Sequence, residues 1–314
     1  MDANDIGDLT ASLFTPGGAL HGRYTPAEGV PFTPIPGAVA GWQAPIFPAG
    51  AISPRIIRAY AVDVPDAPLV RAHWRNEVRA LLRLSSAAHP SLPRFHEGSY
   101  LHESKLGFVI LDDPGIPVVD GHPVRARMLR DPVDAFRRWF ALLEAATLIG
   151  DEGLIHRSIS PLSVSALQDE EAPVVLDGFQ MSTFVAAWVS RATTEGRSPW
   201  LEHLVGPSLA CLAPERAGPL VGKPRQFTEG YRGDVFGLGM LGVLWLAPPT
   251  PDWASRFSAT NYDEPSHLEL AGFPRRDANF PSPSETWTHS KKAARRSRLV
   301  AAFSLWCTPV DSND

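Results

Sequence analysis

Two spacings of apolar residues recur along the chain, and they predict strands early and helices in the middle. Residues 55–64 are rich in β-branched and aromatic side chains and end at Pro65, which predicts a strand. After a His-Pro turn at 89–90, two further strand-like pieces follow, and the second ends at 107–112. Between them, a helix is predicted from an apolar stripe at i, i+4, i+7 and i+8, formed by Trp74, Val78, Leu81 and Leu82.

The second half of the chain is predicted to be mainly helical. A long helix begins at Asp131-Pro132 and ends at Gly150, with Trp139 beside an apolar stripe of Phe136, Phe140, Leu143 and Ile149. The apolar run from Val235 to Ala247 contains three glycines and is too short to span a bilayer, so we interpret it as a buried helix. Loops and short helices are expected over 248–290, and a last helix over 293–306.

Residues 1–48 are rich in proline, glycine and threonine and contain repeated Thr-Pro steps. Proline at this density opposes helices and strand ladders, so an extended arm is expected. Two interpretations stay open for it. It is a mobile tail, or it lies across its own domain or a partner, with modification at the Thr-Pro steps.

Composition narrows the class of protein. The chain has 314 residues, of which 44% are hydrophobic, a net charge of -5 and a pI near 6.1, as expected for a globular protein that does not bind nucleic acid in general. A basic cluster at 291–298 is interpreted as a solvated helix face. Cys211 and Cys307 suggest neither disulfides nor a zinc site, and the start of the chain lacks a secretory pattern, so a cytoplasmic protein without membrane contact is expected.

The most informative stretch is 153–164, Gly-Leu-Ile-His-Arg-Ser-Ile-Ser-Pro-Leu-Ser-Val, followed by Val174-Val175-Leu176-Asp177-Gly178-Phe179. It resembles the protein-kinase catalytic loop, His-Arg-Asp-Leu-x-x-x-x-Asn, and the Asp-Phe-Gly turn after it. Two further pieces fit the family in order. Leu212-Ala213-Pro214-Glu215 resembles its Ala-Pro-Glu, and 231–239 resembles the start of its central helix.

The resemblance implies an α+β, two-lobed kinase-like fold with a small β-rich N-lobe over 49–113 and a larger helical C-lobe over 114–308, between the arm 1–48 and a polar tail 309–314. Glu77 would be the glutamate of the N-lobe helix, and Leu111-Asp112 would enter the hinge. The retained framework residues would hold the loops to one another, with Asp234 bound to the catalytic-loop backbone. They are His156, Arg157, Gly178, Phe179, Pro214, Glu215 and Asp234.

The groups that a kinase uses for chemistry are largely replaced. Ser158 stands where the family has its proton-accepting Asp, and Ser163 where it has the metal-binding Asn. Asp63 aligns with the phosphate-gripping lysine, and no lysine before 223 other than Lys105 exists to replace it. Arg55 or Arg58 would substitute only if its side chain faced the cleft.

If Asp63 faced Glu77, two carboxylates would meet and repel a triphosphate. The glycine-rich phosphate loop is also absent, so Asp177 alone remains of the catalytic set, and it would attract a cation or serve as a turn residue.

Three hypotheses of function follow. The leading one is a catalytically inactive kinase homologue, a pseudokinase, that acts as a scaffold or regulatory subunit through protein partners, by way of the segment Gln180–Leu212 or the arm, with no cofactor and no metal. The second is a nucleotide-dependent transferase in a rearranged cleft, which would take ATP and a metal ion at Glu77 and Asp177. The third is a structural subunit of a larger assembly.

Overall fold

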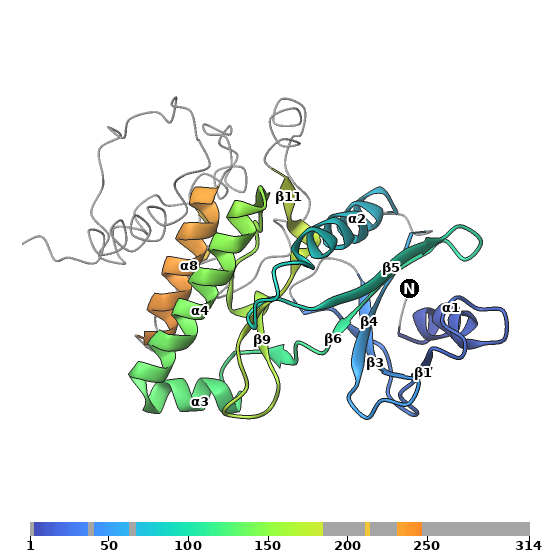
Figure 1. The fold of residues 1–314 in the computed structure, drawn as a ribbon, viewed down its shortest axis with the longest axis horizontal. Helices are drawn as coiled ribbons and strands as arrows, with labels where there is room; N and C mark the ends of the chain where they lie inside the picture. Colours follow the sequence, from blue (N-terminus) through green and yellow to red (C-terminus); the bar gives the residue numbers. More distant parts are fainter. Residues whose placement is uncertain (1–2, 37–40, 63–66, 185–210, 214–230, 247–314) are drawn as a thin grey trace, which may run out of the picture. The chain divides into compact units, whose positions relative to one another are not determined.

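The computed structural model describes residues 3–36, 41–62, 67–184, 211–213 and 231–246, all within a compact unit that spans Met1–His267. The described part is an α+β structure with antiparallel sheets (Figure 1). Its helices are α1 (Ala3–Phe14), α2 (Ala67–Leu84), α3 (Pro123–Arg130), α4 (Pro132–Asp151), α8 (Tyr231–Leu246) and the 3-10 turns η1 (Pro161–Ser163) and η2 (Phe179–Met181). Its strands are β1 (Tyr24–Pro26), β2 (Thr33–Pro34), β3 (Trp42–Pro48), β4 (Arg55–Ala61), β5 (Phe95–Leu101), β6 (Leu106–Asp112), β7 (Ile116–Pro117), β8 (Leu154–Ile155), β9 (Val164–Ala166), β10 (Val175–Leu176) and β11 (Thr183–Phe184).

The main sheet is built around β4 and β6, which are buried along both faces. The strand order is β1-β3-β4-β6-β5, with β2 added beside β3, and every pairing is antiparallel. Side chains alternate along β4, so Ile57, Ala59 and Ala61 join one apolar cluster, whereas Arg58 and Tyr60 point to the side of α2. The strand predicted at 55–64 and the strand predicted at 107–112 are therefore confirmed within the described residues.

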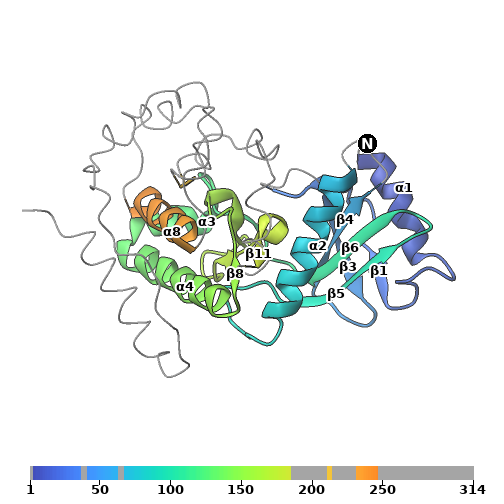
Figure 2. The same cartoon turned by 90° about the horizontal axis from the view of Figure 1, so that it is seen from above.

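The expectation of an extended arm over 1–48 is wrong for the part that the structure describes. Residues 3–14 form α1, and β1, β2 and β3 all belong to the main sheet. Ile6, Leu13 and Leu20 are 0–1% exposed in the cluster that covers one sheet face, opposite α2 (Figure 2). The apolar positions of this segment outweigh its seven prolines, four of which lie within β1, β2 and β3.

The helix α2 is confirmed, but its predicted burial is partly wrong. Leu82, assigned to the apolar stripe, is 59% exposed, whereas Glu77, assigned to the flank, is fully buried. A glutamate on the buried face departs from the apolar pattern, which is why the spacing alone misplaced the face by part of a turn.

The helices α4 and α8 lie side by side and are confirmed as helices (Figure 2). The glycines of α8 permit a close approach, since a Cβ added at Gly242 would lie 2.8 Å from Nε1 of Trp139. That indole N–H donates to the carbonyl of Leu238 at 2.9 Å. On α4 the predicted stripe is wrong at Phe136, which is 47% exposed. The helix predicted over 293–306 and the basic cluster at 291–298 lie outside the described residues.

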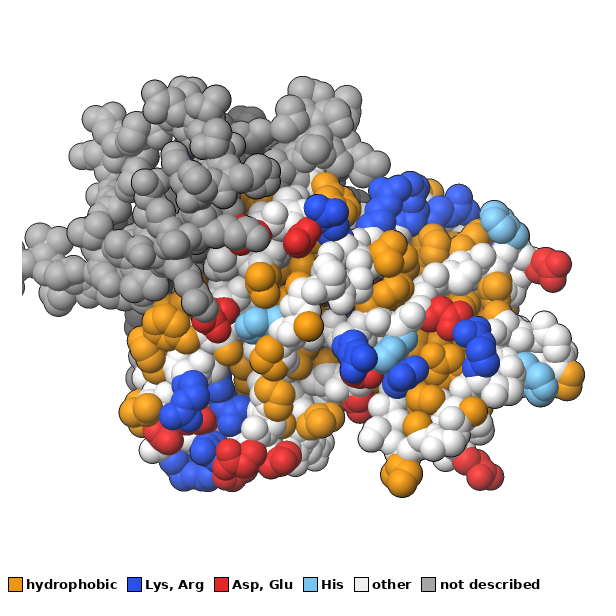
Figure 3. All heavy atoms as spheres, in the orientation of Figure 1, with side chains coloured by type: hydrophobic (Ala, Val, Ile, Leu, Met, Phe, Trp, Pro, Cys, Tyr) orange, Lys and Arg blue, Asp and Glu red, His pale blue; other side chains and the backbone are white. Residues whose placement is uncertain are grey.

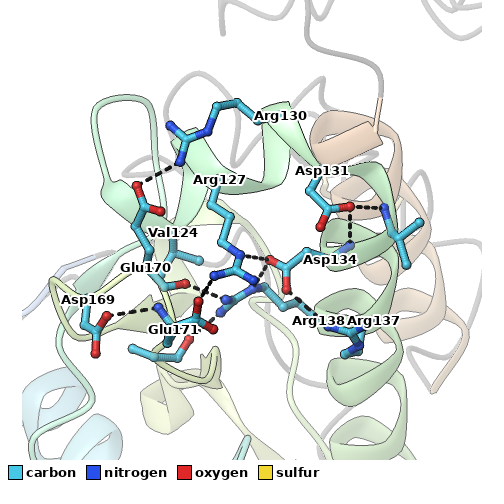
Figure 4. Close-up of polar contacts among 12 residues, drawn as sticks. Val124, Arg127, Arg130, Asp131, Asp134, Arg137, Arg138, Asp169, Glu170 and Glu171 are labelled. Carbon is cyan, nitrogen blue, oxygen red and sulfur yellow. Dashed lines mark hydrogen bonds and ion pairs between the residues drawn. The ribbon is translucent and has the colours of Figure 1, made fainter.

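A network of charges attaches the turn at 169–172 to α3 and α4 (Figure 4). Asp134, almost fully buried, accepts from Nε of Arg138 at 2.6 Å and lies 3.4 Å from Nε of Arg127. Arg138 in turn donates to the carbonyls of Glu170 and Ala172, and Arg127 donates to Glu171. Because β9 and β10 flank this turn, the network fixes the hairpin that leads to Asp177.

Candidate functional site

The centre of the candidate site is the guanidinium of Arg58 on β4, which joins two carboxylates from distant parts of the chain. Its Nη1 donates to Oε1 of Glu77 on α2 and, at 2.8 Å, to Oδ1 of Asp177. Its Nη2 donates to Oδ2 of the same aspartate. Arg58 is 1% exposed, Glu77 0% and Asp177 6%, so the three charges are shielded from water. Buried ions require this kind of mutual pairing, because desolvation would otherwise exclude them.

Neutral donors complete the coordination of Glu77. The hydroxyl of Tyr60, two residues along β4 from Arg58, donates to Oε2 of Glu77. The amide of Gln180, which follows Phe179 in the chain, donates to Oε1 of Glu77 at 3.1 Å and to the Tyr60 oxygen at 3.2 Å. On the other side, Nε of Arg58 makes a longer contact of 3.4 Å with Oε1 of Gln43 on β3. Four elements of the fold therefore converge on this cluster.

The pKa values of the two carboxylates are shifted in opposite directions. Burial raises the pKa of Glu77, and attraction from Arg58 opposes this rise without cancelling it, while the charge of Asp177 adds to it. Burial also acts to raise the pKa of Asp177, but the attraction and paired hydrogen bonds of Arg58, with the N–H of Gly178, outweigh it and lower that pKa below its usual range. One cation shared by two acids thus favours the ionised state of Asp177 over that of Glu77.

The loop before Ser158 is held by Asp234 at the start of α8. Oδ2 of Asp234 accepts from the backbone N–H of His156 at 2.6 Å, and Oδ1 accepts from that of Arg157 at 2.7 Å. Arg157 has a positive φ of 75°, an uncommon conformation that the two hydrogen bonds stabilise. The contact predicted between Asp234 and the loop of His156 and Arg157 is confirmed.

Ser158 and Ser163, the two serines that the resemblance aligns with catalytic residues, form hydrogen bonds with the backbone. The hydroxyl of Ser158 donates to the carbonyl of Gly178 at 3.0 Å. The hydroxyl of Ser163 donates to the carbonyl of Ser160 at 3.0 Å and accepts from its N–H at 2.9 Å, so it closes the turn η1. Both hydroxyls therefore donate to carbonyls that fix the geometry of the loops.

The turn Asp177-Gly178-Phe179 is fixed from both ends. The N–H of Asp177 donates to the carbonyl of Ser163 at 2.7 Å, and Nε2 of His156 lies 2.9 Å from the carbonyl of Asp177. Gly178 has a φ of 86°, which favours glycine over residues with a Cβ. Phe179 is fully buried, and its ring lies 4.7 Å, centroid to centroid, from the imidazole of His156.

The side chain that reaches Glu77 is Arg58, which the sequence predicts only as a substitute for a lysine at the aligned position 63. Asp63 itself lies outside the described residues, so the conditional expectation that it faces Glu77 stays a prediction. The sequence did not indicate Tyr60 or Gln180, although the alternation of β4 places Tyr60 on the same face as Arg58. The predicted residues Pro214 and Glu215 and most of the segment Gln180–Leu212 also lie outside the described residues.

The contacts within this cluster limit its capacity to bind a metal ion. Within the described ranges, no group of three or more His, Cys, Asp or Glu side chains is arranged to hold a metal ion. Asp177 and Glu77 both lie near enough to act on a cation, but the cation already between them is Arg58. Likewise, none of the helices in the described part of the chain is long and apolar enough to cross a membrane.

Comparison with protein-family models and with curated proteins finds no match for this chain.

Proposed function

We propose that this protein is a catalytically inactive member of the protein-kinase superfamily, a pseudokinase, that acts as a protein-binding scaffold or regulatory subunit in the cytoplasm. The observation that carries the proposal is the single guanidinium of Arg58 bound to both Glu77 and Asp177. This contact occupies oxygens of both carboxylates that a kinase would use to bind its lysine and its metal ion.

In an active kinase, the helix glutamate and the aspartate of the turn each bind a different cation, whereas here both bind Arg58. In the family, a strand lysine pairs with the glutamate of the N-lobe helix and grips phosphates, while the aspartate of the Asp-Phe-Gly turn binds Mg²⁺. In this chain, both oxygens of Asp177 accept from Arg58. A metal ion would have to displace a buried, bidentate ion pair, and the freed guanidinium would then lie in the same pocket as the metal, where like charges repel.

The arrangement of elements supports a two-lobed kinase-like fold. Strands β1 to β4 of the antiparallel sheet are followed by α2 with its buried glutamate, then by strands β5 and β6 of the same sheet, the long helix α4, the loop 153–164 and the turn at Asp177. This is the chain order that the motifs imply. The contacts of Asp234 with the backbone of His156 and Arg157 also agree with the framework that the resemblance implies.

The proposal predicts that the full chain does not transfer phosphate. Purified protein with radiolabelled ATP and Mg²⁺ or Mn²⁺ should label neither itself nor general protein substrates. The double variant Ser158→Asp, Ser163→Asn, which returns two family residues, should stay inactive because Arg58 still occupies Asp177. Labelling that Asp177→Ala abolishes would overturn the proposal.

One observation favours the rival, a nucleotide-dependent transferase that binds ATP and a metal ion. Arg58 does face the helix glutamate, as the phosphate-gripping lysine of a kinase does, so a cation is available at that position. The two hypotheses differ in the effect of nucleotide on stability. A saturable, metal-dependent rise in melting temperature with ATP, lost in Arg58→Met, would favour the transferase, and no shift would favour the scaffold.

A further inference from the structure

The exposed face of α2 carries a line of four arginines, Arg71, Arg75, Arg79 and Arg83, at a strict spacing of four residues. All four are exposed, and together they extend over about 18 Å of helix. Glu77, the one acidic residue of α2, is buried on the opposite side. Figure 3 shows Lys and Arg side chains gathered over α2 along the upper edge of the molecule. We call this set the arginine stripe.

Three of the four arginines in the stripe have no acidic partner within the described part of the chain. Arg83 pairs with Glu152 at 2.7 Å, but among the described residues no carboxylate forms an ion pair with Arg71, Arg75 or Arg79. Three other exposed arginines, by contrast, are matched with acids at 2.8 to 3.6 Å: Arg23 with Glu97, Arg130 with Glu170, and Arg137 with Asp134. Like charges four residues apart destabilise a helix, so the stripe opposes the stability of α2 on its own.

We infer that the arginine stripe is the docking surface for an acidic segment of a partner protein, which deepens the proposed scaffold function and rests on it. Guanidinium groups bind carboxylates through two parallel hydrogen bonds, a geometry that lysine does not offer, and the stripe contains no lysine. A partner helix with Glu or Asp at every fourth position would match the spacing turn for turn. A nucleic acid fits less well, because it needs a wide basic face and the whole chain carries a net charge of -5.

The same helix connects this surface to the buried cluster. On the inner side of α2, Glu77 accepts from Arg58, and Nδ2 of Asn76 donates to the carbonyl of Gln180 at 3.2 Å. The hydroxyl of Ser182 also lies 3.5 Å from the carbonyl of Asn76. The helix α2 carries the stripe on its outer side, and on its inner side it contacts residues 180–182 directly and Asp177 through Arg58. A bound segment would therefore act on the helix that helps to position the site.

The test uses the full chain and a fluorescent helical peptide of about 13 residues with Glu at every fourth position. Fluorescence anisotropy should show saturable binding that weakens when NaCl rises from about 0.1 M to about 1 M, which shortens the screening length from about 10 Å to about 3 Å. A peptide with Gln in place of each Glu should not bind. The variant Arg71→Gln, Arg75→Gln, Arg79→Gln should bind the acidic peptide at least about tenfold more weakly.

The matched control is Arg23→Gln, Arg130→Gln, Arg137→Gln, which removes the same charge from exposed arginines that already have acidic partners. It should keep wild-type affinity for the peptide. Equal loss in both variants, or no binding by the wild type, would overturn the inference. So would tighter stripe-dependent binding of an oligouridine or of vesicles that contain phosphatidylserine. Failure here with no phosphate transfer would leave the pseudokinase proposal standing, whereas transfer with intact peptide binding would remove that proposal alone.

Discussion

Arg58 and Asp177, 119 residues apart in sequence, face each other through two hydrogen bonds between the guanidinium and both carboxylate oxygens. This pair fastens β4 of the main sheet to the turn that follows β10, and the shared contact with Glu77 adds α2. The candidate site therefore also stabilises the fold. A metal ion at Asp177 would have to break the contact with Arg58 and so separate elements that this residue holds together. The stability of the fold is in this way connected with the proposed loss of catalysis.

Replacing Arg58 with methionine should destabilise the protein strongly. The variant keeps most of the side-chain volume but leaves Glu77 and Asp177 buried without a cation. Breaking a buried ion pair from one side costs about 3–5 kcal/mol of unfolding free energy. Urea denaturation of wild type and variant at neutral pH measures this difference.

The control for Arg58 is the triple variant Arg58→Met, Glu77→Gln, Asp177→Asn, which removes all three charges. It should recover a large part of the lost free energy, because neutral groups no longer require a buried counterion. If Arg58→Met alone stays within about 1 kcal/mol of wild type, the guanidinium does not stabilise the buried carboxylates and the assigned geometry is wrong.

Glu77 should make stability fall with rising pH. Its pKa is raised in the folded state, mainly by burial, so the folded protein holds its proton more tightly than the unfolded chain does. Its contribution is complete below the unfolded pKa, near 4.5, and is lost as pH rises through the higher folded value. Unfolding free energies at several pH values should show the wild type losing stability relative to Glu77→Gln in this window. A constant difference across the window would contradict the shift.

His73 should act in the opposite direction. It lies one turn before Glu77 on α2, it is 2% exposed, and neither ring nitrogen has a hydrogen-bond partner within the described part of the chain. Burial lowers its pKa from 6.5 to about 4. The unfolded chain therefore binds the proton first as pH falls, and about 3 kcal/mol of unfolding free energy should be lost between pH 6.5 and pH 4. His73→Leu should remove this loss without lowering stability at pH 7, and an unchanged pH profile would show that the ring is solvated.

How much of the fold followed from sequence depended on how regular each segment was. The strand β4 was predictable from its β-branched and aromatic residues, and the helix α4 from its cap: Asp131 accepts from the N–H groups of Val133 and Asp134. The elements of segment 1–48 were not predictable in this way, because its short strands are ordered by pairing with β3 and β4 rather than by their own residues. Proline frequency argued against β1, β2 and β3, which contain four of the seven prolines, and it drew attention away from the apolar positions of α1.

The site was predicted less completely than the fold. Motif spacing located Asp177, His156 and Asp234, because each lies in a local pattern. It could not choose between Asp63 and the candidates Arg55 and Arg58, since the partner of a buried glutamate is decided by strand register, and five residues separate Asp63 from Arg58. The signal that would have found it is the alternation of β4, in which the positions of Arg58 and Tyr60 share one face and those of Ile57 and Ala59 share the other.

The last prediction concerns Asp234, whose carboxylate accepts two backbone N–H groups of the loop before Ser158. Hydrogen bonds to a charged acceptor contribute about 1.5–3 kcal/mol each, so Asp234→Ala should lower the unfolding free energy by about 3–5 kcal/mol. Asp234→Asn should cost nearly as much, since its amide nitrogen would face an N–H. Asp131→Asn is the matched control, because Asp131 also accepts two backbone N–H groups but is exposed, and it should cost at most about 1 kcal/mol. Urea denaturation of the three variants checks the order, and an equal cost at Asp234 and Asp131 would show that the loop of His156 and Arg157 is held by other contacts.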